Sequence, residues 1–262
     1  MSTRSRIAAF ALTIGLLVAL LVAWKVYVSV ADVSKFVLPP PEAVWHSIVD
    51  LLGQGRTWHH VWVTSQEILL GFGLALVCGL AVGVAIGELP VVDRAVNPFL
   101  IALQVLPKVA IIPLLILWMG FGLSAKVVVA AVFAFFPITE GTRAGIRSVE
   151  PGHRDLAATL RATRWQRLRF IVLPSALPSI LTGMEVGVVL ATIGAVVAEY
   201  LAGGEGLGWL AVASLNQLQV ADLFAVIVLL SALGFVAYAA IASLRRILVP
   251  WHPSADDRPP GF

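Results

Sequence analysis

Two ionisable side chains lie inside long apolar stretches of this sequence. Lys108 follows Pro107 in the stretch 99–117, and Glu185 lies in the stretch 177–198. A charged group is costly at membrane depth, so we interpret both residues as candidates for a polar pathway through the membrane. A simpler interpretation stays open for each. Lys108 would lie near lipid headgroups where its helix breaks, and Glu185 would pair with a backbone or hydroxyl group.

Motifs for hydrolytic chemistry are absent from the sequence. There is no H-E-x-x-H zinc motif, no G-x-S-x-G nucleophile elbow and no phosphate-binding G-x-x-x-x-G-K-[ST] loop. We therefore predict no catalytic residue, no metal site and no nucleotide hydrolysis by this chain. His46, His59 and His60 have no ligand motif beside them and are interpreted as surface residues. The glycine-rich stretch 203–208 is interpreted as a tight turn.

The elements that carry these residues are apolar runs long enough to cross a bilayer. Of the 262 residues, 59% are hydrophobic and 13% are charged, which is about half the charged share of a soluble domain. We predict an all-α polytopic membrane protein with about six transmembrane helices and a single membrane domain over residues 1–262. The predicted spans are residues 7–30, 68–87, 99–117, 127–142, 177–198 and 223–244.

The arginines and lysines predict the orientation of these spans. With the N-terminus in the cytoplasm, 13 of the 18 basic residues fall on the inside, 3 on the outside and 2 within spans. The outside residues are Lys35, Arg56 and Lys126. We therefore expect both termini in the cytoplasm of a bacterial cell and the chain in its inner membrane.

The connections between spans have features of their own. The external segment, about residues 31–64, begins with a stiff proline stretch, and residues 42–52 predict an amphipathic helix on the membrane surface. Glu199 is expected at the outer interface, and the tail 250–262 is expected to be disordered. Glycines recur at four-residue spacing, which lets helices approach closely, either within one subunit or between two copies. These glycines are Gly79, Gly83 and Gly87 in one span and Gly183 and Gly187 in another.

The polar segment of about residues 143–174 is the longest connection on the inside and holds seven arginines. Apolar residues predict two short helices with a break near Ala162 and Thr163. Thr163 is expected to cap the second helix, which ends at Leu173–Pro174 where the fifth span begins. Such a helix-break-helix suits docking of another protein, although a basic loop bound to lipid headgroups fits the charge equally well. A nucleic-acid site is not expected in so short a tethered loop.

The run from Asp155 to Pro174 resembles the EAA loop of the permeases of binding-protein-dependent ABC importers. That loop reads approximately E-A-A-x-x-x-G-A-x-x-x-x-x-F-x-x-I-x-L-P. Ile171, Leu173 and Pro174 match its end. Leu156 replaces an alanine, and Arg161 stands where the family has glycine. Because arginine disfavours a positive φ, we expect the break to be shaped differently or shifted by about a residue.

Further segments are similar to the nitrate, sulfonate and taurine branch of that family. They include residues 38–44, 104–122, 173–178 and 198–208, so the resemblance covers about residues 38–250. It implies a homodimer, two cytoplasmic ATPase subunits that hold ATP and Mg²⁺, an external binding protein and contact with lipid, with no cofactor on this chain. The implied solute is a small anion such as a sulfonate, nitrate or taurine.

The resemblance assigns coupling to the ATPase to Asp155, Leu156, Ala157, Leu160, Arg161, Ala162 and Arg164. The candidates for the translocation pathway are Gln104, Lys108 and Glu185, the last two because charge at membrane depth is costly. The rival interpretation is a secondary transporter or channel without ATPase partners, which has no need of the cytoplasmic helix-break-helix.

Overall fold

The computed structural model describes residues 3–250, and these residues form helices and no strand. The predicted all-α class is confirmed. The helices are α1 (Thr3–Val30), α2 (Pro41–Gly53), α3 (Gly55–Glu88), α4 (Pro90–Val105), α5 (Lys108–Met119), α6 (Leu123–Arg147), α7 (Pro151–Thr159), α8 (Arg164–Arg167), a π-helical segment (Leu168–Val172), α9 (Leu173–Ala202), α10 (Leu207–Asn216) and α11 (Val220–Leu248). The predicted tail, beyond residue 250, lies outside the described residues.

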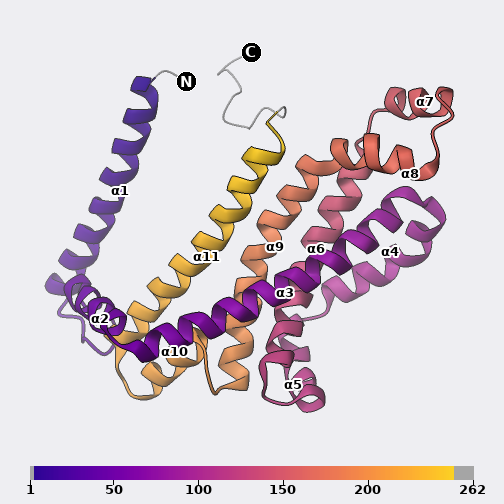
Figure 1. Cartoon of the computed structure of the whole chain (residues 1–262). Helices are drawn as coiled ribbons and strands as arrows, with labels where there is room; N and C mark the ends of the chain where they lie inside the picture. The colour runs from indigo at the N-terminus through magenta and orange to yellow at the C-terminus, as the bar shows by residue number, and fades with distance from the viewer. Residues whose placement is uncertain (1–2, 251–262) are drawn as a thin grey trace.

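Five long helices and one bent pair are candidates for membrane crossings. Within the described part of the chain, five helices are long and apolar enough to span a bilayer, and α4 with α5 form a sixth, bent candidate. The five are α1, α3, α6, the run from α8 through α9, and α11. The start of α1, the end of α11 and the pair α7–α8 lie at one end of the molecule, whereas α2, α5 and α10 lie at the other (Figure 1). We call these the α7 end and the α10 end.

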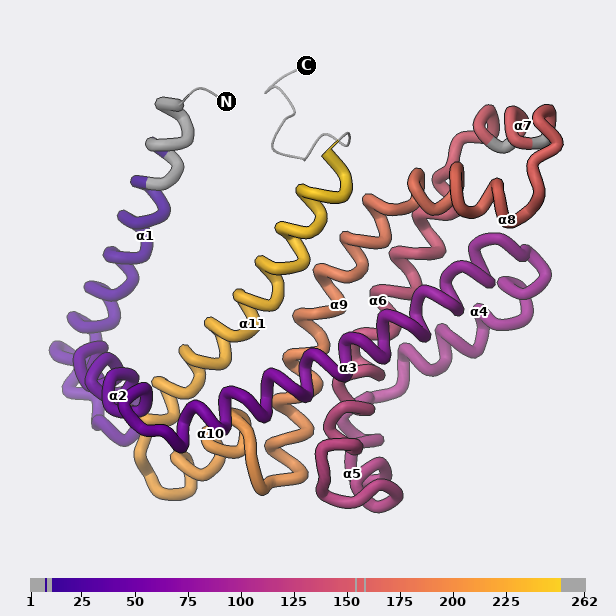
Figure 2. Tube along the Cα trace, in the orientation of Figure 1, coloured from indigo at the N-terminus to yellow at the C-terminus, as the bar shows by residue number. Residues whose placement is uncertain are grey.

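The third predicted span is broken, as the sequence indicated at Pro107, so residues 99–117 do not form one helix. Helices α4 and α5 meet at 92° across Leu106 and Pro107. Leu106 has an extended ψ of 133° because a residue that precedes proline avoids the helical region. Figure 2 shows α4 returning from the α7 end and α5 turning away at the α10 end.

Helix α3 begins at Gly55, within the segment 31–64 that the sequence predicted to be external. The span 68–87 is therefore only the later part of a 34-residue helix. The amphipathic helix is confirmed as α2, whose buried residues include Val44 and Leu51. An ion pair between Lys25 and Glu42 joins α1 to α2, and the hydrogen bond from Lys25 lowers the pKa of the Glu42 carboxyl group.

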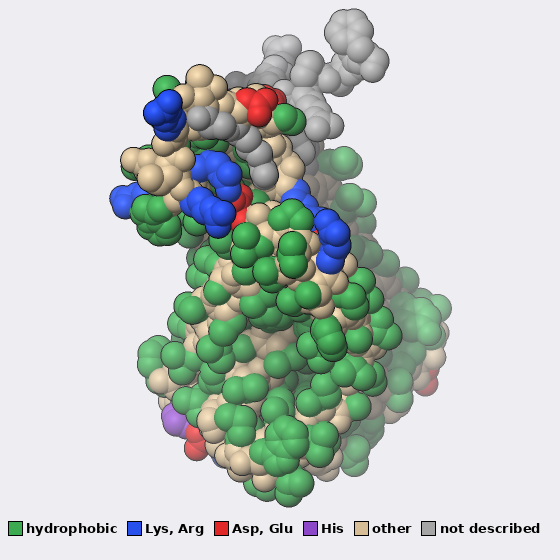
Figure 3. Space-filling view, turned by 90° about the vertical axis from the view of Figure 1, so that its right-hand side faces the viewer, with side chains coloured by type: hydrophobic (Ala, Val, Ile, Leu, Met, Phe, Trp, Pro, Cys, Tyr) green, Lys and Arg blue, Asp and Glu red, His purple; other side chains and the backbone are tan. Residues whose placement is uncertain are grey.

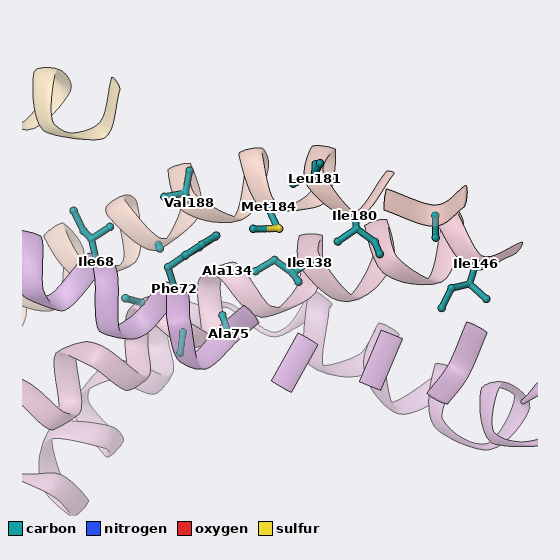
Figure 4. Packing of buried hydrophobic residues seen from close by; sticks show 14 of the residues in the cluster. Ile68, Phe72, Ala75, Ala134, Ile138, Ile146, Ile180, Leu181, Met184 and Val188 are labelled. Atoms are coloured by element: carbon teal, nitrogen blue, oxygen red, sulfur yellow. The ribbon is translucent and has the colours of Figure 1, made fainter. Parts of the chain in front are cut away.

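The core lies between α3, α6 and α9 (Figure 4). Its labelled side chains come from all three helices, including Phe72 on α3, Ile138 on α6 and Met184 on α9. Glycines make the close approach of α3 to α6 possible. A Cβ at Gly83 would lie 2.6 Å from Cβ of Thr142, a contact that real Cβ atoms do not make.

The glycine series therefore packs within one subunit. Gly79 and Gly87 face Ile138 and Ile146 of α6, one helical turn to either side of Gly83. Gly183 and Gly187 of α9 likewise contact the backbone and side chains of α6. Of the two alternatives left open by the spacing, the structure selects helix packing inside the chain.

The outer surface is that of a membrane protein. Large apolar side chains are exposed along α1 and α11, such as Leu20 (71%) and Phe235 (68%). In Figure 3, hydrophobic side chains cover most of the visible face, and Lys and Arg gather toward the α7 end. The basic residues thus lie beyond the apolar belt, as expected for the positively charged side of a membrane protein.

Candidate functional site: the α7–α8 loop and the buried charges

Helices α7 and α8 form the expected helix-break-helix at one end of the bundle. Thr163 caps α8, since its hydroxyl accepts a hydrogen bond from the backbone of Gln166 and the Gln166 side chain accepts one from the Thr163 backbone. This reciprocal arrangement satisfies donors that would otherwise be free at the start of the helix. The predicted capping role of Thr163 is confirmed.

Arg161 ends α7 in the conformation that glycine usually adopts. Its φ is 53°, and the Ala162 amide donates to the Ala157 carbonyl over 2.9 Å. This six-to-one bond with a left-handed residue before it is the Schellman arrangement that ends many helices. The expectation that arginine would reshape or shift the break is therefore wrong. The loop keeps its turn and holds Arg161 in a left-handed conformation, at a cost of about 1–2 kcal/mol.

No break separates the loop from the fifth span, which corrects the expected helix end at Leu173–Pro174. The run from Arg164 to Ala202 is continuous, and its segment Leu168–Val172 is π-helical. Proline has no amide hydrogen to donate, and a π-turn, with its wider hydrogen bonds, accommodates the loss. Helices α8 and α9 thus form one continuous helical run.

The exposed surface of the loop differs from the predicted one at a single residue. Leu156 and Leu160 are 54% and 70% exposed, so two large apolar side chains of the loop face outward. Ala157, in contrast, is 2% exposed and packs inside the protein. The assignment of Ala157 to an outer docking surface is corrected. Asp155, Arg161 and Arg164 are exposed, and Ala162 is half-buried.

Ion pairs tie the loop and its neighbours to the bundle. Arg167 of α8 lies 2.5 Å from a carboxylate oxygen of Glu88 at the end of α3. Asp93 of α4 pairs with Arg143 at 2.9 Å and with Arg147 at 2.6 Å, both from α6. Arg167 thus pairs within the chain. The α7 end is therefore one connected unit of α3, α4, α6 and α8.

The three predicted pathway residues lie in different surroundings. Gln104 is exposed on α4, and Lys108 is half-buried at the start of α5 with its ammonium 5.1 Å from the centre of the Phe136 ring. Glu185 is paired with Arg245 of α11 at 3.3 Å. That pairing replaces the backbone or hydroxyl partner that was considered for Glu185. No hydrogen bond or ion pair joins any two of these three residues.

A buried charge network at the α10 end is the feature that the sequence interpretation missed. Glu67 and Glu199 are fully buried, and Lys126 is 4% exposed. Lys126 Nζ lies 3.0 Å from Glu67 Oε1 and donates to the Glu205 carbonyl over 2.9 Å. Lys126, expected in a loop, lies near the start of α6, and Glu199, expected at the outer interface, is buried between helices near the end of α9. A cation from α6 thus pairs with a carboxyl group from α3, and the Glu199 carboxyl group from α9 lies in the same buried cluster.

The glycine-rich turn before α10 closes over this network. The Thr64 hydroxyl donates to Glu199 Oε1 over 2.6 Å, and the Gly208 amide donates to Glu199 Oε2 over 2.5 Å. Gly206 has a φ of 110°, and a side chain there would collide with the Glu199 carboxylate. The tight turn predicted for residues 203–208 is confirmed, and its glycines are required by the close approach to Glu199.

His60 is also buried, which corrects its interpretation as a surface residue. It is 3% exposed, and its Nδ1 accepts a hydrogen bond from the Gly206 amide over 3.1 Å. His59 remains exposed, beside Glu205. A signal for the whole network was present in the sequence. Glu67, Lys126 and Glu199 fall at the ends of three predicted spans that share one side of the membrane.

Comparison with known proteins defines the class of the chain. Residues 75–251 match the family described as binding-protein-dependent transport system inner membrane component, and the chain belongs to this family. It is 35% identical over 232 residues to the formylaminopyrimidine transport permease protein ThiX of Halalkalibacterium halodurans, with 88% of this chain and 92% of that protein covered.

Other relatives support the same assignment. The riboflavin transport system permease protein RibX of Chloroflexus aurantiacus is 37% identical, with 91% of this chain and 89% of that protein covered. The taurine transport system permease protein TauC of Escherichia coli is 31% identical, with 92% and 90% covered. The fold is similar to a chain of the MetNI methionine ABC transporter in an inward-facing conformation, with a TM-score of 0.65, 21% identity and 72% and 94% covered.

The protein is therefore the membrane-spanning permease component of an ABC importer. Proteins of this family work with an ATPase and a binding protein, and ATP is hydrolysed by the partner ATPase. The rival interpretation as a channel or secondary transporter is set aside by the family match.

Proposed function

We propose that two copies of this permease form the translocation pathway, and that α7 and α8 of each copy dock on one ATPase subunit. Opening and closing of the ATPase pair would then move α9 through the continuous helix Arg164–Ala202. ATP and Mg²⁺ belong to the partner subunits, and the permease itself holds no cofactor. A binding protein delivers the solute from outside the inner membrane, and lipid surrounds the apolar belt.

The observation that carries the docking proposal is the exposed pair Leu156 and Leu160. Two leucines that project beyond the membrane belt on a short helix are unfavourable in water, and burial of each contributes about 1.5–3 kcal/mol. We expect a groove on the partner ATPase to bury the Leu156 and Leu160 side chains. Arg161 and Arg164 beside them contribute less, because exposed ion pairs are worth only about 0–1 kcal/mol.

The test is solute-stimulated ATP hydrolysis by the reconstituted importer. Leu156→Glu places a charge in the docking groove and is expected to abolish stimulation, whereas Arg164→Ala is expected to retain most of it. Ala157→Glu is a poor test, since its buried position makes the loop itself unstable. Co-purification of the ATPase reports on assembly. Intact assembly and full stimulation in Leu156→Glu would remove the docking proposal.

We further propose that the α7 end faces the cytoplasm. Arg143, Arg147 and the arginines of α8 gather there, and the start of α1 and the end of α11 lie at the same end (Figure 1). Reporter fusions after His153 should report inside, and those after Gln217 should report outside. The opposite pair of results would invert the arrangement.

For the solute, we propose a small anion that passes Lys108. This lysine is half-buried between Phe133 and Phe136 at the bend of α4 and α5, and among the described residues it has no carboxylate partner. Glu185 is already neutralised by Arg245 and is a weaker pathway candidate. Lys108→Met should impair transport while assembly survives. Normal transport by this variant would place the pathway elsewhere.

A further inference from the structure

An apolar groove lies between α3, α9 and α11, apart from the docking loop and from Lys108. Its volume is about 590 Å³, within the range of ligand pockets. On α9 it extends from Leu173 to Met184, and on α11 it is lined by Leu244 and Leu248. The start of α9 and the end of α11 both lie toward the α7 end (Figure 2). The groove therefore occupies the half of the bundle nearest the α7 end.

The length of the groove matches one leaflet of a bilayer. Met184 follows Leu173 by 11 residues, which is about 16 Å along α9 at 1.5 Å per residue. The hydrocarbon core of a bilayer is about 30 Å thick, so one leaflet contributes about 15 Å. The groove therefore has the length of the hydrocarbon region of the leaflet at the α7 end.

The side chains of the groove favour a flexible hydrocarbon chain over another helix. Gly79 and Gly83 let α3 approach α6 closely, as is typical of helix contacts in a membrane. The groove is lined instead by leucine, isoleucine, valine and methionine, and Ala81 is the one small residue in its described lining. A second spanning helix would also need a contact surface across the whole bilayer, about twice the length of the groove.

One positive charge at the α7 end of the groove has no carboxylate partner. Two ion pairs near the groove are each neutral, namely Arg245–Glu185 and Arg167–Glu88. Arg169 lies one turn before Leu173 on the same continuous helix, so both residues share a face, and Arg169 is exposed. Within residues 3–250, its guanidinium group forms no ion pair or hydrogen bond and lies 5.7 Å from the centre of the Phe170 ring. Arg169 is therefore available to an anionic group.

We propose that this groove binds one anionic phospholipid from the leaflet at the α7 end. A hydrocarbon chain of the lipid lies between α3, α9 and α11, and its phosphate lies beside Arg169. A zwitterionic lipid brings an ammonium group that Arg169 repels, so a headgroup of net negative charge is favoured. Arg246 provides a matched control. It lies two residues from both Leu244 and Leu248, about 160° around α11 from each, and therefore faces away from the groove.

The test is native mass spectrometry of the delipidated permease–ATPase complex, titrated with dioleoyl phosphatidylglycerol or dioleoyl phosphatidylcholine. One phosphatidylglycerol per permease should bind about fivefold more tightly than phosphatidylcholine, equivalent to about 1 kcal/mol for one arginine near the membrane surface. Arg169→Gln should remove this preference, whereas Arg246→Gln should retain it. Glycerol 3-phosphate, a headgroup without chains, should not displace the lipid.

A second pair of variants tests the position of the hydrocarbon chain. Ala81→Trp fills the groove and should weaken binding of both lipids at least about tenfold. Ala232→Trp adds the same side chain at an exposed position of α11 outside the lining and should leave binding unchanged. Unfolding temperatures of the purified complexes show that both variants are folded.

Four results would overturn the proposal. The first is equal binding of the two lipids, which would leave only general contact with the bilayer. The second is the same loss of preference in Arg246→Gln as in Arg169→Gln, which would reduce the effect to surface charge. The third is unchanged binding in a folded Ala81→Trp variant, which would place the chain elsewhere. The fourth is loss of the permease pair in Ala81→Trp with no lipid bound to the unaltered complex, which would make the groove a contact with a second copy.

Discussion

Replacement of Lys126 by methionine is expected to destabilise the permease by about 3–5 kcal/mol, the cost of removing one partner from a buried ion pair. Lys126 is 4% exposed, and its ammonium lies 3.0 Å from Glu67, with Glu199 in the same network. Methionine fills a similar volume, so little of the effect comes from a cavity. The loss is that of the cation that, among the described residues, pairs with Glu67 beside the second buried carboxyl group, Glu199.

A comparison of variants isolates the charge balance. Glu67→Gln leaves one carboxyl group for one cation, so it should lower the free energy of unfolding less than Lys126→Met does. The double variant Lys126→Met with Glu67→Gln should recover part of the loss, because two charges are removed together. Lys108→Met is the matched control, since Lys108 has only aromatic neighbours worth about 0.5–1 kcal/mol.

The assay is thermal unfolding of the purified complex, followed by tryptophan fluorescence. At roughly 2–4 °C per kcal/mol for a chain of this size, Lys126→Met should lower the midpoint by roughly 6–20 °C. A shift no larger than that of Lys108→Met would refute the reasoning that Lys126 balances the buried carboxyl groups.

Three further predictions concern packing and the loop. Gly83→Leu should prevent folding because its side chain would meet α6, whereas Gly73→Leu, with open space around its Cβ, should express normally; equal yields would contradict the close packing. Arg161→Gly should relieve the left-handed conformation and raise the free energy of unfolding by up to about 1–2 kcal/mol, seen as a higher unfolding midpoint, without loss of ATPase stimulation; a lower midpoint would contradict the strain assigned to Arg161. Glu88→Gln removes the partner of Arg167 and should reduce solute-stimulated ATP hydrolysis while ATPase co-purification remains; unchanged stimulation would show that this ion pair does not help transmit the motion.

The spans were predictable because long apolar runs identify membrane helices regardless of tertiary contacts. The α7–α8 loop was predictable as well, since Thr163 and the apolar spacing around it act locally. The sequence predicted the bend at Leu106–Pro107 only in part. Proline indicates a break in the sequence, but the 92° angle depends on how α4 and α5 pack against the rest of the bundle.

The buried network escaped the sequence interpretation for a physical reason. Each of Glu67, Lys126 and Glu199 alone looks like an interfacial charge at a span end, and burial becomes acceptable only when three helices bring them together. Ala157 is a related case. The apolar periodicity groups residues on one face of the helix, but it does not say which face the rest of the protein buries. Ala157 is buried in the folded chain, where the helix ends at the left-handed Arg161.

The most direct test of the central claim is a crosslink between the loop and the ATPase. Cys78 is replaced by serine, and Leu160, which is 70% exposed, is replaced by cysteine. A short bifunctional reagent should then join Leu160→Cys to the ATPase subunit in the assembled importer, with a yield that changes when ATP is bound. Leu117→Cys, 76% exposed on α5, is the control and should not crosslink. A complex that contains the ATPase but yields no Leu160→Cys crosslink would contradict the assignment of α7–α8 as the coupling element.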